Sequence, residues 1–193
     1  MCSGKAADAH ALTALFNCLF ADAENTVLIG GADEPLYEPG DGGALPARIY
    51  FRADFAASAL HETAHWCIAG AERRRCTDYG YWYSPDGRGS DAQRRFLEVE
   101  SRPQALEWAF ALACGRSFRL SLDNLDAPTD TQDQQDFVDA VCEEARRVKE
   151  GHCSKRAQRF MKTLAAEFRP EDLAQAGGDP LKMLHFKRAD LTS

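Results

Sequence analysis

The sequence predicts an α+β protein in which a helical body carries a small, mainly antiparallel sheet. Three observations support this class: several long segments repeat apolar residues at helical spacing, short β-branched or aromatic runs lie between them, and turn-rich stretches bound those runs. The chain has 193 residues, of which 45% are apolar and 27% charged. This length suits one core and is short for two, so we expect a single domain over residues 1–193.

The first quarter of the chain predicts one helix and two strands. Apolar residues at helical spacing predict an amphipathic helix over residues 8–21. The β-branched run 26–29 predicts a strand that stops at Gly30-Gly31, and residues 48–51 predict a second strand after a turn-rich loop. Two strands joined by a long loop fit an antiparallel pair.

The next segment predicts a helix and a third strand. Asp54 is the expected N-cap of a helix that runs to about Gly70. The aromatic run Tyr79-Gly80-Tyr81-Trp82-Tyr83 has strand character and ends in the turn Ser84-Pro85-Asp86-Gly87. We therefore expect a strand just downstream of this helix.

The remainder of the chain predicts three longer helices, at about residues 91–115, 131–149 and 154–168. Pro103 lies inside the first of them. Because the residue before a proline is disfavoured in α geometry, Pro103 is expected either to open a fresh helix or to kink a continuous one.

Charge and composition exclude several classes of function. The net charge of −7 argues against binding to nucleic-acid backbones or to anionic membrane surfaces. The N-terminus lacks a long apolar run behind positive charges, and no apolar run approaches the roughly 20 residues of a membrane span. Seven scattered cysteines form no C-x-x-C pair. We expect a soluble, cytoplasmic protein with reduced thiols, and the sequence does not indicate its oligomeric state.

The segment ALHETAHWCIAG, residues 59–70, contains an H-E-x-x-H motif on the predicted helix. His61 and His65 are one helical turn apart, so their imidazoles can face one metal ion. Glu62 lies about 100° around the helix, within reach of a metal-bound water. The motif predicts a zincin-like metal-binding helix.

A site with two neutral histidines usually needs a carboxylate as a third ligand. Sequence spacing does not select among the downstream candidates, which are Asp78, Asp86, Glu98, Glu100, Glu107 and Asp123. The motif alone favours a zinc peptidase with Glu62 as general base, whereas a two-histidine, one-carboxylate set also holds non-haem iron. The ligand types alone do not distinguish a zinc peptidase from a non-haem iron enzyme.

A wider set of segments resembles one family. The segments are DEPLYEP (33–39), RIYF (48–51), ASALHETAHWCIAG (57–70), GYWYSPDGR (80–88), VESRPQALEW (99–108) and DNL (123–125). In this order they resemble the bacterial elongation factor P hydroxylases, and the similarity runs from the first helix to about Leu125. It is more specific than H-E-x-x-H because several segments without metal chemistry match as well.

The resemblance implies an iron-dependent monooxygenase that uses O2. Its partner would be elongation factor P carrying a β-lysyl-lysine, with the new oxygen placed on C5 of the acceptor lysine. Matched to the family pattern, the ligands of Fe(2+) are His61, His65 and Glu100. Glu62 then becomes a supporting catalytic residue that orients a ligand or passes protons. The departures from the family lie in loops, around residues 41–43 and 88–90, and leave this ligand set intact.

The aromatic run supplies the candidate substrate residues Asp78, Tyr81, Trp82 and Tyr83. Aromatic walls pack methylene groups and hold ammonium groups, and a carboxylate neutralises them. The same rings would equally suit the alternating core and surface positions of a strand. No dinucleotide-binding fingerprint is present, so the reductant is not indicated. Two other readings stay open: a zinc-dependent peptidase, and a non-catalytic translation-factor-binding module with a structural metal.

Overall fold

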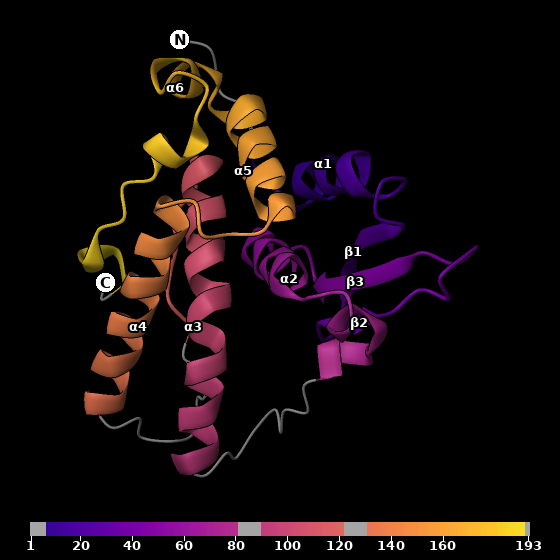
Figure 1. The fold of residues 1–193 in the computed structure, drawn as a ribbon, viewed down its shortest axis with the longest axis horizontal. Coiled ribbons are helices and arrows are strands. Elements are labelled where there is room, and N and C mark those ends of the chain that lie inside the picture. Colours follow the sequence, from indigo (N-terminus) through magenta and orange to yellow (C-terminus); the bar gives the residue numbers. More distant parts are fainter. Residues whose placement is uncertain (1–6, 81–89, 122–130, 192–193) are drawn as a thin grey trace.

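The structure, a computed structural model, describes residues 7–80, 90–121 and 131–191 (Figure 1). It confirms the α+β class: a helical body lies beside a small sheet. The main elements are α1 (Ala9–Phe20), β1 (Thr26–Ala32), β2 (Leu36–Glu38), β3 (Ala47–Arg52), α2 (Ala56–Ile68), α3 (Ser90–Ala113), α4 (Thr131–Lys149), α5 (Lys155–Phe168) and α6 (Pro170–Gln175). Short 3-10 helices are η1 (Arg73–Arg75), η2 (Thr77–Gly80), η3 (Pro180–Met183) and η4 (Arg188–Leu191).

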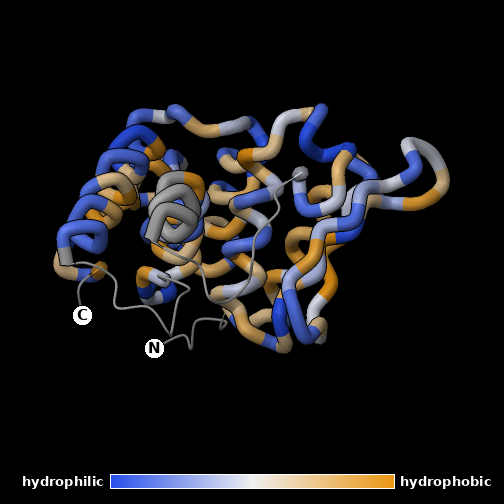
Figure 2. The backbone as a smooth tube through the Cα atoms, turned by 90° about the horizontal axis from the view of Figure 1, so that it is seen from below, coloured by the Kyte–Doolittle hydropathy of each residue, from blue (hydrophilic) through white to orange (hydrophobic). Residues whose placement is uncertain are grey.

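The sheet has the strand order β1-β3-β2 and is mixed. β2 pairs antiparallel with β3, but β1 pairs parallel with β3, with Leu28 opposite Ile49. The prediction that the first two strands form an antiparallel pair is therefore wrong. The reason is β2, a short strand inside the turn-rich loop, which reverses the chain so that β3 runs in the direction of β1. The tip of the β2–β3 connection projects from the body (Figure 2).

The glycine pair at the end of the first predicted strand lies within β1 and does not end it. A Cβ atom on Gly30 would lie 2.6 Å from the Phe51 ring, so only glycine lets β3 approach this closely. Gly31 has a φ of +88°, and the β1–β3 register shifts between Ile29 and Ala32. The pair therefore forms a bulge in a continuing strand.

Helix α2, which carries the H-E-x-x-H motif, lies between the sheet and α3 (Figure 1). Its N-cap is Phe55, with no side-chain hydrogen bond, so the prediction of Asp54 as the cap is wrong. Packing fixes the helix instead. Trp66 is fully buried, with ring centroids 5.1 Å from Phe16 and 4.9 Å from Phe20.

The C-terminal end of α2 is capped by an arginine from α5. The Arg156 guanidinium donates to the carbonyl oxygens of Trp66 at 3.1 Å and Ala69 at 2.8 Å, and it lies 4.7 Å from the Trp66 ring centroid. The last carbonyls of a helix have no partner within the helix, so this contact satisfies two of them. Residues from the end of the chain therefore fix the helix that carries both histidines.

Helix α3 runs unbroken through Pro103, so this proline does not open a fresh helix. Pro103 is buried within α3, which packs against α2, α4 and α5. The predicted helices at 131–149 and 154–168 are confirmed as α4 and α5, with Ser154 capping α5. None of the helices in the described ranges is long and apolar enough to cross a membrane.

The strand predicted over residues 79–83 is not confirmed at its start. Tyr79 and Gly80 belong to the 3-10 segment η2, while Tyr81, Trp82 and Tyr83 lie outside the described residues. The preference of aromatic residues for strands was outweighed here by contacts of η2 with β2.

Candidate metal centre

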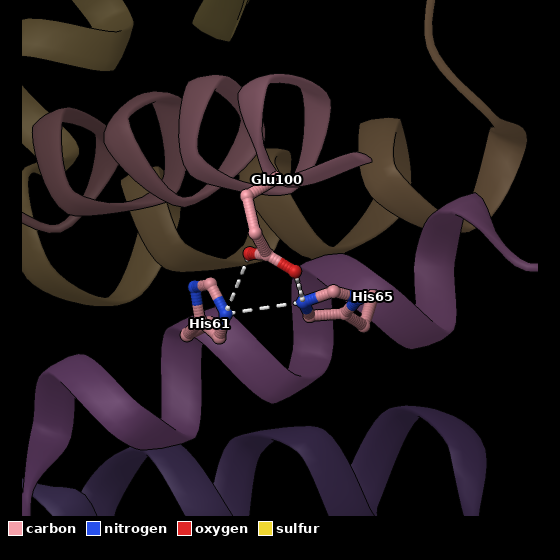
Figure 3. Close-up of side chains that lie close together, drawn as sticks. All are labelled: His61, His65 and Glu100. Carbon is pink, nitrogen blue, oxygen red and sulfur yellow. Dashed lines mark hydrogen bonds and ion pairs between the residues drawn. The ribbon is translucent and has the colours of Figure 1, made fainter. Parts of the chain in front are cut away.

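Two neighbouring helices bring three metal-binding side chains together. His61 and His65 project from α2, and Glu100 points down at them from α3 (Figure 3). The two histidine Nε2 atoms are 3.0 Å apart. One Glu100 oxygen lies 3.3 Å from Nε2 of His61, and the other lies 3.4 Å from Nε2 of His65. Among the described side chains, Glu100 is the carboxylate grouped with both histidines.

These distances suit a bound cation. Metal–ligand bonds of about 2.1 Å at angles of roughly 90–110° place adjacent ligand atoms about 3.0–3.4 Å apart. In addition, Glu100 is only 3% exposed, and among the described residues its Oε2 has no polar contact closer than the 3.3 Å approach to Nε2 of His61. A buried carboxylate oxygen held this loosely is costly, and a cation would remove that cost. The residues present therefore fit a divalent metal ion.

Glu107 supports the site from the far side of a histidine ring. Its Oε2 lies 2.9 Å from Nδ1 of His61, whereas Nε2 of that ring faces His65 and Glu100. When Nδ1–H donates to the carboxylate, the Nε2 lone pair is free for a metal. Glu107 follows Glu100 by two turns of α3, so one helix supplies both carboxylates. Glu107 therefore contacts His61 on the side of the ring away from His65 and Glu100, and it lies outside the group of three.

Opposing charges shift the pKa values of these groups. Burial is the largest influence on His61 and lowers its pKa, but hydrogen bonds and charges from Glu100 and Glu107 together raise it well above the usual range. Burial acts to raise the pKa of Glu100, yet the two nearby histidines bring it far below the ordinary value. Glu107 has a raised pKa because burial outweighs its contact with His61. Without metal, the raised pKa of His61 favours a proton on its ring.

Glu62 follows His61 on α2 and is partly buried. Burial raises the pKa of its carboxyl group, against the lowering effect of His61 and His65. Within the described part of the chain, the structure records no hydrogen bond of the Glu62 side chain. It is available for proton transfer beside the cluster, and its catalytic role stays a prediction.

The predicted substrate residues are only partly described. Asp78 uses Oδ1 to accept a hydrogen bond of 2.8 Å from the backbone N–H of Tyr37. This contact holds the η2 turn against β2, and a contact of Asp78 with substrate stays a prediction. Tyr81, Trp82 and Tyr83 lie outside the described residues, as do Asp86, Asp123 and the side chain of Glu98.

A cavity of about 550 Å³ opens beside the cluster. It is bounded by the C-terminal end of α2, the turn that follows and one side of α3, and its lining includes His65, Gly70, Tyr79, Val99 and Arg102. His65 of the cluster thus forms part of its wall.

Comparisons with known proteins cover the part of the chain that contains this cluster. A family model described as Elongation factor P hydroxylase matches residues 15–177. The chain belongs to the elongation factor P hydroxylase family. A protein of Haemophilus influenzae described as Elongation factor P lysine hydroxylase is 46% identical over 162 residues, which cover 83% of this chain and 89% of that protein.

The family match extends beyond the sequence segments that first indicated it. It continues through α4 and α5, whereas the resemblance in the sequence faded near Leu125. The chain's match to the elongation factor P hydroxylase family therefore covers the three side chains of the cluster and the helices that pack around α3.

Two features of the site were missed by the sequence analysis. The sequence indicated the contact between Glu107 and His61 only weakly, through the position of Glu107 two turns after Glu100 on a predicted helix. Nothing in the sequence indicated that Arg156 caps α2, because it lies far away in the sequence and belongs to a different helix.

Proposed function

We propose that this protein hydroxylates the β-lysylated lysine side chain of elongation factor P in the cytoplasm. Ferrous iron would be held by His61, His65 and Glu100, and O2 would be the co-substrate. The observation that carries the proposal is the convergence of these three side chains, at the distances a metal requires, in a chain of this family. Two histidines and one carboxylate are the usual ligand set for iron that activates oxygen in non-haem enzymes.

When bound, iron would supply the redox chemistry that a carbon–hydrogen bond demands. The balance is one substrate C–H, one O2, two electrons and two protons, giving one C–OH and one water. A separate reductant must provide the electrons, because the sequence has no dinucleotide-binding fingerprint. The protein's own groups orient the site and move protons.

Each of these groups has a distinct task. Glu107 keeps the Nδ1 proton on His61 and so leaves Nε2 free for metal. Glu62 relays protons to or from the site, which suits a partly buried carboxyl group with a raised pKa. The cavity beside His65 admits the long side chain. Asp78, Tyr81, Trp82 and Tyr83 remain the proposed substrate contacts.

The test is a mass measurement on the partner. Iron-loaded protein and a reductant are incubated in air with β-lysylated elongation factor P, and the product is examined as an intact protein and as peptides. We expect one added oxygen atom on the modified lysine. The His61→Ala variant serves as the inactive control. The surface variant Lys162→Ala is its matched control and should remain active.

Other outcomes identify the alternatives. Cleavage of the partner would indicate a zinc-dependent peptidase with Glu62 as base. Tight binding with an unchanged mass would indicate a translation-factor-binding module with a structural metal. Either result would overturn the hydroxylase proposal.

A further inference from the structure

The turn before residue 81 has an unusual backbone. Asp78 and Tyr79 have φ values of +47° and +57°, and Gly80 follows at +74°. Left-handed geometry is easy for glycine but costs other residues about 1–3 kcal/mol each. Asp78 and Tyr79 therefore store strain next to the cluster, and other contacts must hold the turn in place.

Three contacts from β2 and η1 hold it. The Asp78 carboxylate accepts the Tyr37 backbone N–H, and the Arg73 guanidinium donates to the Tyr79 carbonyl oxygen at 3.3 Å. The rings of Tyr37 and Tyr79 stack with centroids 4.2 Å apart and planes 17° from parallel. The turn is thus fixed through its side chains as well as its backbone.

The strained turn places the Tyr79 ring against the metal-binding helix. This ring lies nearly parallel to the His65 imidazole, at 8°, with centroids 6.4 Å apart. Both residues line the cavity described above. Tyr79 is only 5% exposed, and after burial the Glu62 carboxylate has the largest effect on the pKa of its hydroxyl group, which it raises. The ring therefore lies beside His65 at the wall of the cavity.

The hydroxyl group of Tyr79 is buried and has no hydrogen-bond partner among the described residues. The neighbouring Tyr37 provides a contrast, since its hydroxyl donates to the Arg74 carbonyl oxygen at 2.8 Å. Leaving a buried hydroxyl unpaired costs about 1–3 kcal/mol. A strained turn that also carries an unpaired hydroxyl is difficult to explain by folding alone, and both costs make sense if a ligand supplies the partner.

We propose that the Tyr79 hydroxyl donates a hydrogen bond to the substrate, at the amide carbonyl oxygen that joins the added lysyl group to the acceptor lysine. This inference rests on the proposed function and names the group that distinguishes modified from unmodified substrate. Burial and the nearby Glu62 carboxylate raise the pKa of Tyr79 well above its usual range, so the phenol keeps its proton and acts as a donor. An unmodified lysine offers an ammonium group there, which has no oxygen to accept this bond.

The test compares two tyrosine-to-phenylalanine variants. Tyr79→Phe removes the unpaired hydroxyl, while Tyr37→Phe removes a paired one from the adjacent ring outside the cavity. For each protein, thermal unfolding, metal affinity and oxygen-free binding of β-lysylated and unmodified elongation factor P are measured with zinc in the site. A final assay measures kcat/KM for oxygen transfer with iron.

We expect Tyr79→Phe to unfold at the same or a higher temperature and to bind metal normally. Its affinity for the modified partner should fall roughly three- to tenfold, the loss typical of one neutral hydrogen bond, with no change for the unmodified partner. Tyr37→Phe should unfold at a lower temperature and bind the modified partner as the wild type does. This opposite pattern separates substrate recognition from structural support.

The inference is overturned if Tyr79→Phe binds the modified partner with wild-type affinity, or weakens binding of both partners equally. A loss of thermal stability matching that of Tyr37→Phe would also overturn it, because the hydroxyl would then be paired. A wild-type protein that does not prefer the modified partner counts against it in the same way. If the wild type prefers that partner and Tyr79→Phe loses the preference, yet no oxygen is transferred, the hydroxylase proposal fails while the Tyr79 contact stands.

Discussion

Glu107 should control metal affinity without contacting the metal. Its carboxylate is 2.9 Å from Nδ1 of His61, and the residue is 8% exposed, so water cannot easily replace it. Replacing Glu107 with leucine leaves the Nδ1–H group of His61 unpaired and the ring free to rotate. Losing such a carboxylate partner typically costs 10–100-fold in metal affinity, or about 1.4–2.7 kcal/mol.

The glutamine variant sharpens this prediction. Glu107→Gln keeps an oxygen that can accept the Nδ1–H bond but removes the charge. Hydrogen bonds to charged groups are about twice as strong as neutral ones, so roughly half of the free-energy loss should remain. We therefore expect an order of affinities in which the wild type binds metal most tightly, glutamine is intermediate and leucine is weakest.

The assay is an anaerobic titration of metal-free protein with Fe(2+), in competition with a chelating dye at fixed pH. A matched control is Gln104→Leu on the same helix: Gln104 is also buried, and its amide bonds the Ser121 backbone at 2.7 and 3.0 Å. This control should lose thermal stability and keep metal affinity. The reasoning is refuted if Glu107→Leu binds metal as the wild type does, or if Gln104→Leu weakens binding equally.

Three further predictions concern α2. The pKa of His61 is raised in the metal-free protein, so protonation of His61 stabilises the metal-free fold at low pH. This stabilisation should be lost as the pH rises through the raised pKa, and metal affinity should increase over the same pH range. Calorimetry at several pH values measures both effects. Glu62→Gln should lower kcat more than metal content, and equal loss of both would disprove a proton-relay role. Trp66→Ala should lower the free energy of unfolding by about 3–5 kcal/mol in denaturant titrations, since the ring is fully buried; a change below about 1 kcal/mol would contradict the packing described.

The sequence predicted the histidine pair because four-residue spacing on a helix is a local property. Glu100 could not be selected in that way, since its position depends on how α3 crosses α2, and only resemblance to a family singled it out. The parallel pairing of β1 and β3 escaped prediction for a related reason: a three-residue strand, Leu36–Glu38, has too few residues for a periodic signal.

Local rules failed where long-range contacts decide the backbone. Asp54 has the right chemistry for an N-cap, yet α2 begins after Phe55, and the burial of Trp66 fixes this helix more strongly than a cap would. Tyr79 has strand preference, but Asp78 and the stacked Tyr37 ring hold it in left-handed geometry. Neither contact is visible in the residues next to the turn.

The cap that Arg156 places on α2 bears on any attempt to shorten this protein. Every side chain assigned to the cluster lies between residues 61 and 107, so a fragment ending near residue 125 would carry the whole ligand set. Such a fragment would nevertheless leave the last carbonyls of α2 without their arginine and expose the Trp66 ring where α5 covers it. A minimal peptide cut from this chain to carry the cluster must therefore include a replacement for α5, because the cluster is local in sequence while its support is not.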